Sequence, residues 1–423
     1  MAQDLDCAAL RRAVTHTHII GAGLAGLSAA VELTKAGHQV TLYEAGPAAG
    51  GRCRSYFDRA LGARIDNGNH LLLSGNDAAL DFLSTIGARD SMHGPGTAYF
   101  PFMDLTTGER WIVEPGAGRI PWWVLTRRVP GTRLRDYLAL LRLRTAPAGA
   151  SVAEMVGGTE LYRRLLEPLA VSGLNTPAET GLASLMWAVV DGSLLRGGAA
   201  CVPLVPREGL SESFIDPALA WLAARGGTLH LSTRVTALDI ADGRIAALHL
   251  PTGPVPVAAQ DCVVMAVPPW VAADLVPGLV VPDSFEAIVN LHFRCDAEPG
   301  RAGFIGLVGG TAEWIFIKPG IVSVTISAAN RLQDVPNEEI AMGVWADIQK
   351  ALNRSDPMPP MRVVREKRAT FAATRAGETR RPGPDTGLTH FAVAGDWTAT
   401  GLPATIEGAI RSGRTAALAL LTA

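Results

Sequence analysis

The sequence predicts an α/β fold in which a nucleotide-binding domain is joined to a second domain. A glycine-rich turn between an apolar strand and a helix lies near the start, at residues 21–26. A second strand, small-residue loop and helix lie near the end, at residues 391–410. The chain has 423 residues, 48% of them hydrophobic, which is enough for two intimately packed domains.

Composition excludes several classes of protein. The net charge of −2 argues against nucleic acid as a partner, because phosphate binding needs a basic excess. The five cysteines form no Cys-x-x-Cys pair, so we expect a reducing, cytoplasmic location and no metal site. Residues 1–17 lack the apolar core of a secretory signal and are expected to be a disordered leader. The sequence has no uninterrupted run of about 18 apolar residues, so no membrane-spanning helix is predicted.

The first glycine-rich turn has the context that a dinucleotide-binding site requires. A strand over residues 17–20 leads into Gly21-Ala-Gly-Leu-Ala-Gly26, a helix follows, and Glu44 ends the next strand. Gly21 would make the tight turn, Gly23 would admit the pyrophosphate and Gly26 would allow helix–strand packing, with Glu44 on the ribose hydroxyls. An ordinary glycine turn is the alternative. The residues expected at the cofactor are Gly21, Gly23, Leu24, Ala25, Gly26, Glu44 and Ala45.

The next glycines favour FAD over NAD. Gly50, Gly51 and Arg52 follow Glu44 after a short loop, and they resemble the second FAD signature of the amine oxidase and phytoene desaturase superfamily. Two glycines allow a close backbone approach to the cofactor, and a guanidinium can pair with diphosphate oxygens. Glu44 disfavours a 2′-phosphate, so NADP is not expected.

Two later segments resemble the remaining parts of an FAD site in that superfamily. Val235 lies where the superfamily's backbone meets the adenine, and Ala266 ends an apolar strand before a proline pair. The segment from residue 395 resembles the superfamily's C-terminal flavin motif, which implies that Gly395 and Asp396 contact the ribityl chain and diphosphate. The same motif implies that the pyrimidine edge faces the start of a helix, whose dipole stabilises negative charge on the ring. Those residues are Pro403, Ala404, Thr405 and Ile406.

Three strings carry a more specific resemblance, to the hydroxysqualene dehydroxylase family of the bacterial hopanoid pathway. They are G-D-W-T-A-T-G-L-P-A-T-I-E-G-A from residue 395, D-N-G-N-H over 66–70 and L-N-T-P over 174–177. The resemblance implies a Rossmann-like FAD-binding domain with a discontinuous α+β substrate domain, the GR2-type fold of amine oxidases. It also implies that reduced FAD supplies hydride to replace the hydroxyl of hydroxysqualene, an apolar isoprenoid, giving squalene. An unidentified electron donor would reduce the FAD.

The sequence departs from related patterns in three places. Asn69 stands where the family usually has glutamine. The last tyrosine is Tyr162, so the cage tyrosine of amine oxidases is absent. The last cysteine is Cys295, which removes the C-terminal thioether link of monoamine oxidases, so FAD is expected to bind non-covalently.

Two residues are candidates for the chemistry itself. Asn67 and Gly68 are expected to approach the flavin ring together with Asn69 and His70, and His70 is the candidate acid that protonates the leaving hydroxyl. A packed or solvated histidine without a proton role is the alternative. The faces of the flavin or of Trp397 would shield the allylic cation.

Each of the two predicted domains is made of separate segments of the chain. Residues 18–75, 205–275 and 385–423 would bind FAD, and residues 76–204 and 276–384 would bind the substrate. Segment 119–144 has seven arginines against one aspartate, together with Trp122 and Trp123. The spacing of Leu134, Leu138 and Leu141 predicts a helix with an apolar face. This segment would either lie on anionic lipid, at the inner face of the cell membrane, or form a lid, and both readings stay open.

Two rival functions are compatible with the fold. A phytoene-type desaturase or an amine oxidase would need an oxidant rather than reduced FAD. A lipid-escort protein of the same fold would bind no flavin at all, which the intact glycine and glutamate set disfavours.

Overall fold

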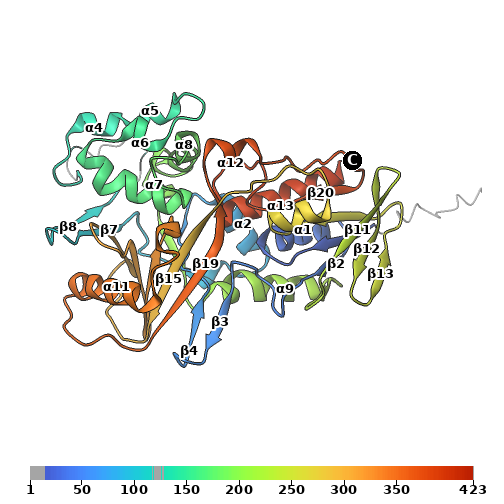
Figure 1. The fold of residues 1–423 in the computed structure, drawn as a ribbon, viewed down its shortest axis with the longest axis horizontal. Helices are drawn as coiled ribbons and strands as arrows, with labels where there is room; N and C mark the ends of the chain where they lie inside the picture. The colour runs from blue at the N-terminus through green and yellow to red at the C-terminus, as the bar shows by residue number, and fades with distance from the viewer. Residues whose placement is uncertain (1–14, 117, 119–124, 126–127, 423) are drawn as a thin grey trace, which may run out of the picture.

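The computed structural model describes residues 15–116, 118, 125 and 128–422 (Figure 1). The predicted leader therefore lies outside the described residues except for its last three positions, and Trp122 and Trp123 lie outside them entirely. No helix in the described part of the chain is long and apolar enough to cross a membrane.

A five-stranded parallel sheet forms the centre of the first domain, in the order β10-β2-β1-β14-β20. The strands are β1 (His16–Ile20), β2 (Gln39–Tyr43), β10 (Thr228–His230), β14 (Cys262–Met265) and β20 (Phe391–Val393). A strand that is buried on both faces is a continuous run of apolar residues in the sequence. Four of these five strands could be predicted for that reason. The sheet joins segments from the start, middle and end of the chain.

Each face of this sheet is covered by a different layer. One face packs on α1 (Leu24–Lys35), α2 (Asp77–Thr85), α9 (Asp216–Ala223) and α13 (Ile406–Leu421). The other face packs on a three-stranded antiparallel sheet of β11 (Ala237–Ala241), β12 (Arg244–Leu250) and β13 (Gly253–Pro256). The turn at Asp242 and Gly243 joins β11 to β12, and both residues have a positive φ.

The first and last long helices lie against each other, α1 against α13 (Figure 1). A Cβ on Gly413 would stand 2.2 Å from the carbonyl oxygen of Ala25, so the backbones approach closely. The Ser28 hydroxyl donates to the carbonyl of Ile410 at 2.8 Å. This contact brings the C-terminal motif beside the N-terminal glycine turn.

A seven-stranded sheet forms the second domain, in the order β19-β15-β18-β17-β16-β7-β8. Its pairs are antiparallel except for the parallel pair β16–β7. One face packs on α11 (Asn337–Leu352) through alternate residues of the strands. The strands are β7 (Phe100–Asp104), β8 (Arg110–Val113), β15 (Phe285–Phe293), β16 (Phe304–Val308), β17 (Trp314–Lys318), β18 (Ile321–Ile326) and β19 (Met361–Phe371).

Smaller elements connect the two sheets. A hairpin of β3 (Ser55–Asp58) and β4 (Ala63–Asp66) projects from the first domain, and β9 (Pro203–Pro206) pairs with both β5 (Leu72–Leu73) and β6 (Met92–His93). Strand β9 thus spans the predicted boundary at 204/205, and the division into domains at the predicted residues stays a prediction. The other α-helices are α4 (Leu134–Leu138), α5 (Leu140–Arg144), α6 (Val152–Val156), α7 (Glu167–Leu174), α8 (Ala183–Gly192), α10 (Pro269–Leu275) and α12 (Arg375–Thr379).

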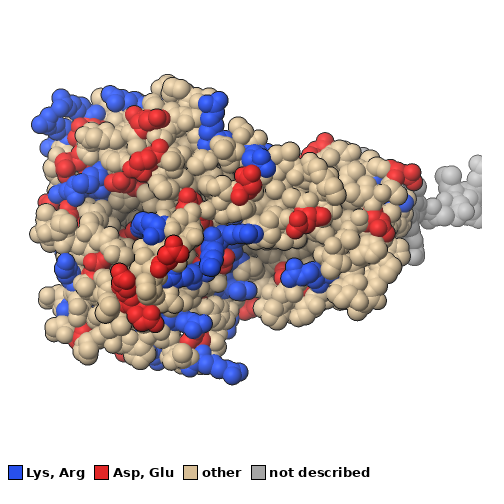
Figure 2. All heavy atoms as spheres, viewed as in Figure 1, with Lys and Arg blue, Asp and Glu red and all other residues tan. Residues whose placement is uncertain are grey.

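The predicted helix through Leu134, Leu138 and Leu141 is two short helices, α4 and α5, that meet at Ala139. The three leucines do not form the packed face. They are 46%, 66% and 53% exposed, whereas Leu143 and Ala139 are buried. Basic side chains gather at the end of the molecule that carries α4 and α5 (Figure 2), while both signs of charge are mixed elsewhere on this face.

Candidate functional site

Two glycines of the first turn are required by the backbone itself. Gly21 has a φ of +103°, and a Cβ there would stand 2.5 Å from the carbonyl oxygen of Ala266. A Cβ on Gly26 would stand 2.0 Å from the carbonyl oxygen of Gly21. The turn therefore packs directly on the end of β14, and the predicted site residue Ala266 lies against it.

Gly23 has a different environment, which fits a bound diphosphate. No heavy atom lies within 4 Å of the position that its Cβ would occupy. Gly23 is the N-cap of α1, and the first turn of that helix has neither a capping side chain nor an acidic residue. Leu24 and Ala25 follow in the first turn. The positive end of the helix dipole and its free N–H groups are thus available to an anion.

Glu44 holds together the segments that are predicted to bind the adenosine. Its carboxylate accepts hydrogen bonds from the backbone N–H of Ala22 at 3.0 Å and of Gly46 at 2.7 Å. The N–H of Thr233 donates to the carbonyl of Glu44 at 2.8 Å, which places the segment leading to Val235 beside Glu44 and Ala45. A carboxylate oxygen can accept more than one hydrogen bond, so Glu44 can still receive ribose hydroxyls.

The second glycine pair lies beside the first turn. The N–H of Gly50 donates to the carbonyl of Ala22 at 2.8 Å, and Gly50 forms a parallel bridge with Gly23. Gly51 has a φ of +57°. Arg52 then extends to the C-terminal loop, where its Nη2 lies 2.7 Å from Oδ1 of Asp396. The two predicted halves of the site are therefore in contact.

A buried arginine that the sequence did not reveal holds the C-terminal loop. The guanidinium of Arg381 donates to the carbonyls of Thr398 and Asp396 and to the hydroxyl of Thr400. Its side chain is fully buried, and it pairs with Glu378 at 2.8 Å. Gly395 is fixed separately, through its N–H to Ser412 at 2.9 Å. Hydrogen bonds to backbone carbonyls leave no pattern in a sequence. The sequence therefore could not predict this set of contacts, the Arg381 clamp.

Helix α13 starts where the sequence predicted a helix. Thr405 is the N-cap, and its hydroxyl accepts from the N–H of Gly408 at 3.0 Å. Pro403 and Ala404 precede it, and Ile406 begins the helix. Glu407 has a structural task that the sequence did not reveal. Its carboxylate accepts from the N–H groups of Ala78 and Ala79 at 3.2 and 2.8 Å, which caps α2.

Loop 67–70 lies on a polar strip of the seven-stranded sheet. The amide of Asn290 on β15 donates to the carbonyl of Asn67 at 3.3 Å, and a Cβ on Gly68 would stand 3.1 Å from that amide nitrogen. Thr325 on β18 donates to Asn290 at 2.8 Å and accepts from Asn69 at 3.1 Å. The sheet thus fixes the loop that is predicted to meet the flavin.

His70 is held in one tautomer. Its Nδ1 lies 3.0 Å from the carbonyl oxygen of Gly68, which can only accept, so Nδ1 carries a hydrogen. Burial lowers the pKa of His70 below its ordinary value of 6.5. The ring is therefore neutral near pH 7 with Nε2 unprotonated, and it can donate a proton from Nε2 only after it becomes an imidazolium.

Trp397 is buried at the junction of the two halves. Its side chain is 2% exposed, and its Nε1 donates to the carbonyl of Val267 at 2.9 Å. The ring therefore stiffens the loop that carries Asp396. Contact between this ring and a substrate stays a prediction.

A polar cavity of about 220 Å³ adjoins loop 67–70. Lys318 and Asp66 form an ion pair of 2.6 Å in it. Although burial raises the pKa of Asp66, the Lys318 ammonium holds it below its usual range. His292 accepts from or donates to Ser323 at 2.7 Å, and burial lowers its pKa to about 4. The lining residues are Arg64, Ile65, Asp66, Asn69, Arg207, Glu208, His292, Lys318, Pro319, Ile321 and Ser323.

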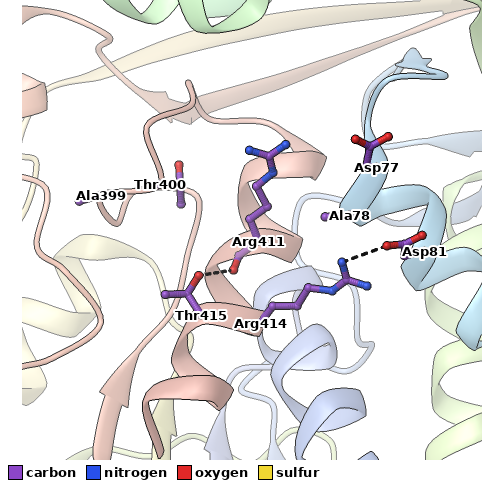
Figure 3. Close-up of a pocket in the computed structure, with 8 residues that line it drawn as sticks. All are labelled: Asp77, Ala78, Asp81, Ala399, Thr400, Arg411, Arg414 and Thr415. Atoms are coloured by element: carbon purple, nitrogen blue, oxygen red, sulfur yellow. Dashed lines mark hydrogen bonds and ion pairs between the residues drawn. The ribbon is translucent and has the colours of Figure 1, made fainter. Parts of the chain in front are cut away.

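A larger cavity of about 410 Å³ lies between α2 and α13 and contains none of the predicted site residues. Figure 3 shows Arg411 and Arg414 of α13 on one side and Asp77 and Asp81 of α2 on the other. Arg414 and Asp81 approach to 3.5 Å. The arginines and aspartates face each other across this cavity.

Known structures resemble this fold along nearly its whole length. An oxidoreductase from Methanosarcina mazei aligns with a TM-score of 0.73 and 16% identity, covering 97% of this chain and 100% of the other. Putrescine oxidase bound to putrescine aligns with a TM-score of 0.70 and 16% identity, covering 97% and 99%. At this identity the likeness concerns the fold alone.

The sequence pattern of flavin-containing amine oxidoreductases matches residues 24–421, so the chain belongs to that family and is an FAD-dependent oxidoreductase. Two curated relatives make the assignment narrower. Hydroxysqualene dehydroxylase of Sinorhizobium fredii is 48% identical, covering 95% of this chain and 97% of its own. The protein of the same name from Rhodopseudomonas palustris is 47% identical, covering 96% and 98%. The chain is therefore a member of the hydroxysqualene dehydroxylase family.

Proposed function

We propose that the protein replaces the hydroxyl of hydroxysqualene with hydrogen and releases squalene and water. The identity of 46–48% with three proteins named hydroxysqualene dehydroxylase, over nearly the whole length of each chain, carries this proposal. A probable zeta-carotene desaturase from Synechococcus elongatus is only 26% identical, which favours the dehydroxylase over the desaturase.

The chain supplies a binding site that spans the length of the cofactor. We propose that α1 and Gly23 bind the diphosphate, Glu44 the ribose, and Arg52 with Asp396 the middle of the cofactor. Thr405 and the start of α13 would face the pyrimidine edge. The open space at Gly23 and the contact between Arg52 and Asp396 support this placement of the cofactor. Bound FAD, once reduced by an external electron donor, supplies the hydride.

The chain must also deliver a proton, because the hydroxyl leaves as water. We propose His70 as the donor, through Nε2 of its imidazolium form. The bond from Nδ1 to the Gly68 carbonyl fixes the ring so that Nε2 is the nitrogen that gains and loses the proton. Asn67, Gly68 and Asn69 would then hold the ring of His70 at the flavin's edge.

Anaerobic turnover distinguishes this function from its rivals. The holoenzyme is reduced with dithionite, incubated with hydroxysqualene and analysed for squalene. A dehydroxylase converts about one equivalent of substrate per reduced flavin and leaves the flavin oxidised. Formation of squalene by the oxidised enzyme, or none by the reduced enzyme, contradicts the proposal. A purified protein without flavin absorbance would instead indicate a lipid escort.

We also propose that α4 and α5 contact the membrane from which an apolar C30 substrate is taken. Three exposed leucines lie among the exposed Arg133, Arg135, Arg142 and Arg144. Leucines next to arginines suit an interface of anionic lipid, whereas a lid closed on the protein would bury those leucines.

Co-sedimentation with phosphatidylglycerol vesicles tests the proposed membrane contact. Leu138→Asp should reduce binding at least severalfold, and Leu418→Asp, at an exposed leucine on α13, should not. Equal binding of both variants contradicts the membrane contact.

A further inference from the structure

Three side chains that can ligate a metal meet at the amino end of the central sheet. His16 and His18 lie two residues apart on β1, so their side chains share one face of the strand. Asp261 directly precedes β14, which is paired with β1. One potential ligand atom from each of the three lies within 4.8 Å of the other two. Gly21 and the predicted cofactor lie at the opposite end of β1.

The imidazole of His18 lacks a partner on the side of this cluster. Its side chain is 4% exposed, and its Nε2 has no hydrogen-bond partner among the described residues. The nearest carboxylate oxygen, Oδ2 of Asp261, lies 4.0 Å away, which is too long for a hydrogen bond. Nitrogen and oxygen ligands of one tetrahedral ion lie about 3.4 Å apart, so a small closure would let both atoms bind one ion. Oδ2 of Asp261 also accepts from the N–H of Ala258 at 3.2 Å, which holds the carboxylate beside His18.

Neighbouring hydroxyl groups hold both rings by their other nitrogen. The hydroxyl of Tyr43 lies 3.1 Å from Nδ1 of His18, and that of Thr41 lies 2.9 Å from Nε2 of His16. Such contacts fix the orientation of metal-binding histidines and select the nitrogen that faces the ion. They leave Nε2 of His18 and Nδ1 of His16 for the cluster.

We propose that His16, His18 and Asp261 bind one divalent transition-metal ion of the Zn²⁺ type, apart from the flavin site. Two imidazoles and a carboxylate are ligands that such ions accept, with water completing the coordination because His16 and Asp261 are only partly buried. The ion would join the amino ends of β1 and β14. The absence of a Cys-x-x-Cys pair predicted no metal site. Asp261 is far from His18 in the chain, so residue spacing gives no signal for this cluster.

Calorimetric titration of the untagged holoenzyme with Zn²⁺ tests this site, since a histidine tag would add ligands. We expect one ion per chain, and His18→Gln should weaken binding at least about tenfold. Thermal unfolding should shift upward with Zn²⁺ and return with a chelator, at unchanged flavin content. His249→Gln is the matched control: it removes one histidine from a partly exposed pair with Asp239 at 2.9 Å and should leave the affinity unchanged.

Equal affinity of the wild type and His18→Gln, or no binding by the wild type at micromolar Zn²⁺, would overturn the proposal. If His18→Gln does not fold, His16→Gln and Asp261→Asn decide instead, because both positions are partly exposed and tolerate a polar replacement. Loss of affinity in either one supports the site, and full affinity in both rejects it.

Discussion

Neighbouring glycines of one turn serve different purposes, and this difference can be measured. Gly26→Ala would place a methyl group 2.0 Å from a backbone carbonyl oxygen, so we expect it to lower the free energy of unfolding by about 1–3 kcal/mol. Gly23→Ala places the methyl in open space, so the loss should stay within about 1 kcal/mol. The same methyl would occupy the space proposed for the diphosphate. Flavin content after purification should therefore fall sharply in Gly23→Ala.

That comparison rests on the proposed cofactor position. Full flavin content in Gly23→Ala would mean that the diphosphate does not approach α1 there, although the chain binds FAD. Denaturant unfolding of the flavin-free proteins measures the two stabilities without a contribution from bound cofactor.

The role of His70 gives a prediction about pH. Because burial lowers its pKa, the imidazolium is scarce at pH 8 and becomes more abundant as the pH falls. If His70 donates the proton, the single-turnover rate of reduced enzyme should rise toward acid pH. His70→Ala should slow this step by about a hundredfold and flatten the profile. His70→Gln, which keeps a hydrogen-bond donor near the Gly68 carbonyl, should be equally slow. A rate within about threefold of wild type in His70→Ala rules out the acid role.

At the scale of elements, the loop of residues 396–400 depends on one arginine. Lysine at position 381 keeps the charge but cannot donate to the carbonyls and hydroxyl that the fixed guanidinium reaches. We expect Arg381→Lys to lower the free energy of unfolding by about 3 kcal/mol and to reduce flavin content. Arg380→Lys, at the neighbouring and partly exposed pair with Asp283, should cost less than about 1 kcal/mol. Similar losses in both variants would contradict the clamp.

Elements were predicted well where the signal is local. The strand that ends at Ile20, the helix after it and the helix that starts at Ile406 all follow from apolar runs and glycines next to each other in the chain. The helix at Leu134 was predicted as one and is two, and its three leucines are exposed instead of forming the packed face. The spacing of apolar residues predicts that a helix has an apolar face, but it does not predict what that face packs against.

The candidate site was predictable for the same reason, and only in part. Glycines that let a backbone approach a cofactor form a pattern in the sequence, so the first turn and Gly50 could be predicted as site residues. The contact between Arg52 and Asp396 could be inferred only from the length of FAD. The clamp of Arg381, the cap by Glu407 and the polar strip of Asn290 and Thr325 depend on which strands become neighbours. None of these has a counterpart in residue spacing.

For the whole molecule, a buried histidine links stability to pH. His292 is 1% exposed, and burial lowers its pKa from 6.5 to about 4. Below pH 6.5 the unfolded chain therefore binds a proton that the folded chain refuses, so stability falls as the pH falls from 6.5 to about 4. The loss from this residue approaches about 3 kcal/mol.

Urea unfolding at several pH values measures this loss. His292→Gln should have a flatter dependence of the free energy of unfolding on pH than the wild type. His249→Gln, on the partly exposed β12, should follow the wild type. Parallel curves for His292→Gln and the wild type would show that His292 takes up its proton equally in both states.

The pairing of α1 with α13 has a consequence for biosynthesis. Residues 24–35 are synthesised before residues 406–421, so α1 has no partner helix while the segments between them are made. Throughout that time one apolar flank of the nascent chain is uncovered and available to chaperones. The second half of the proposed FAD site is added only when residues 391–410 have been synthesised, so a chain that stops before residue 391 should retain little FAD.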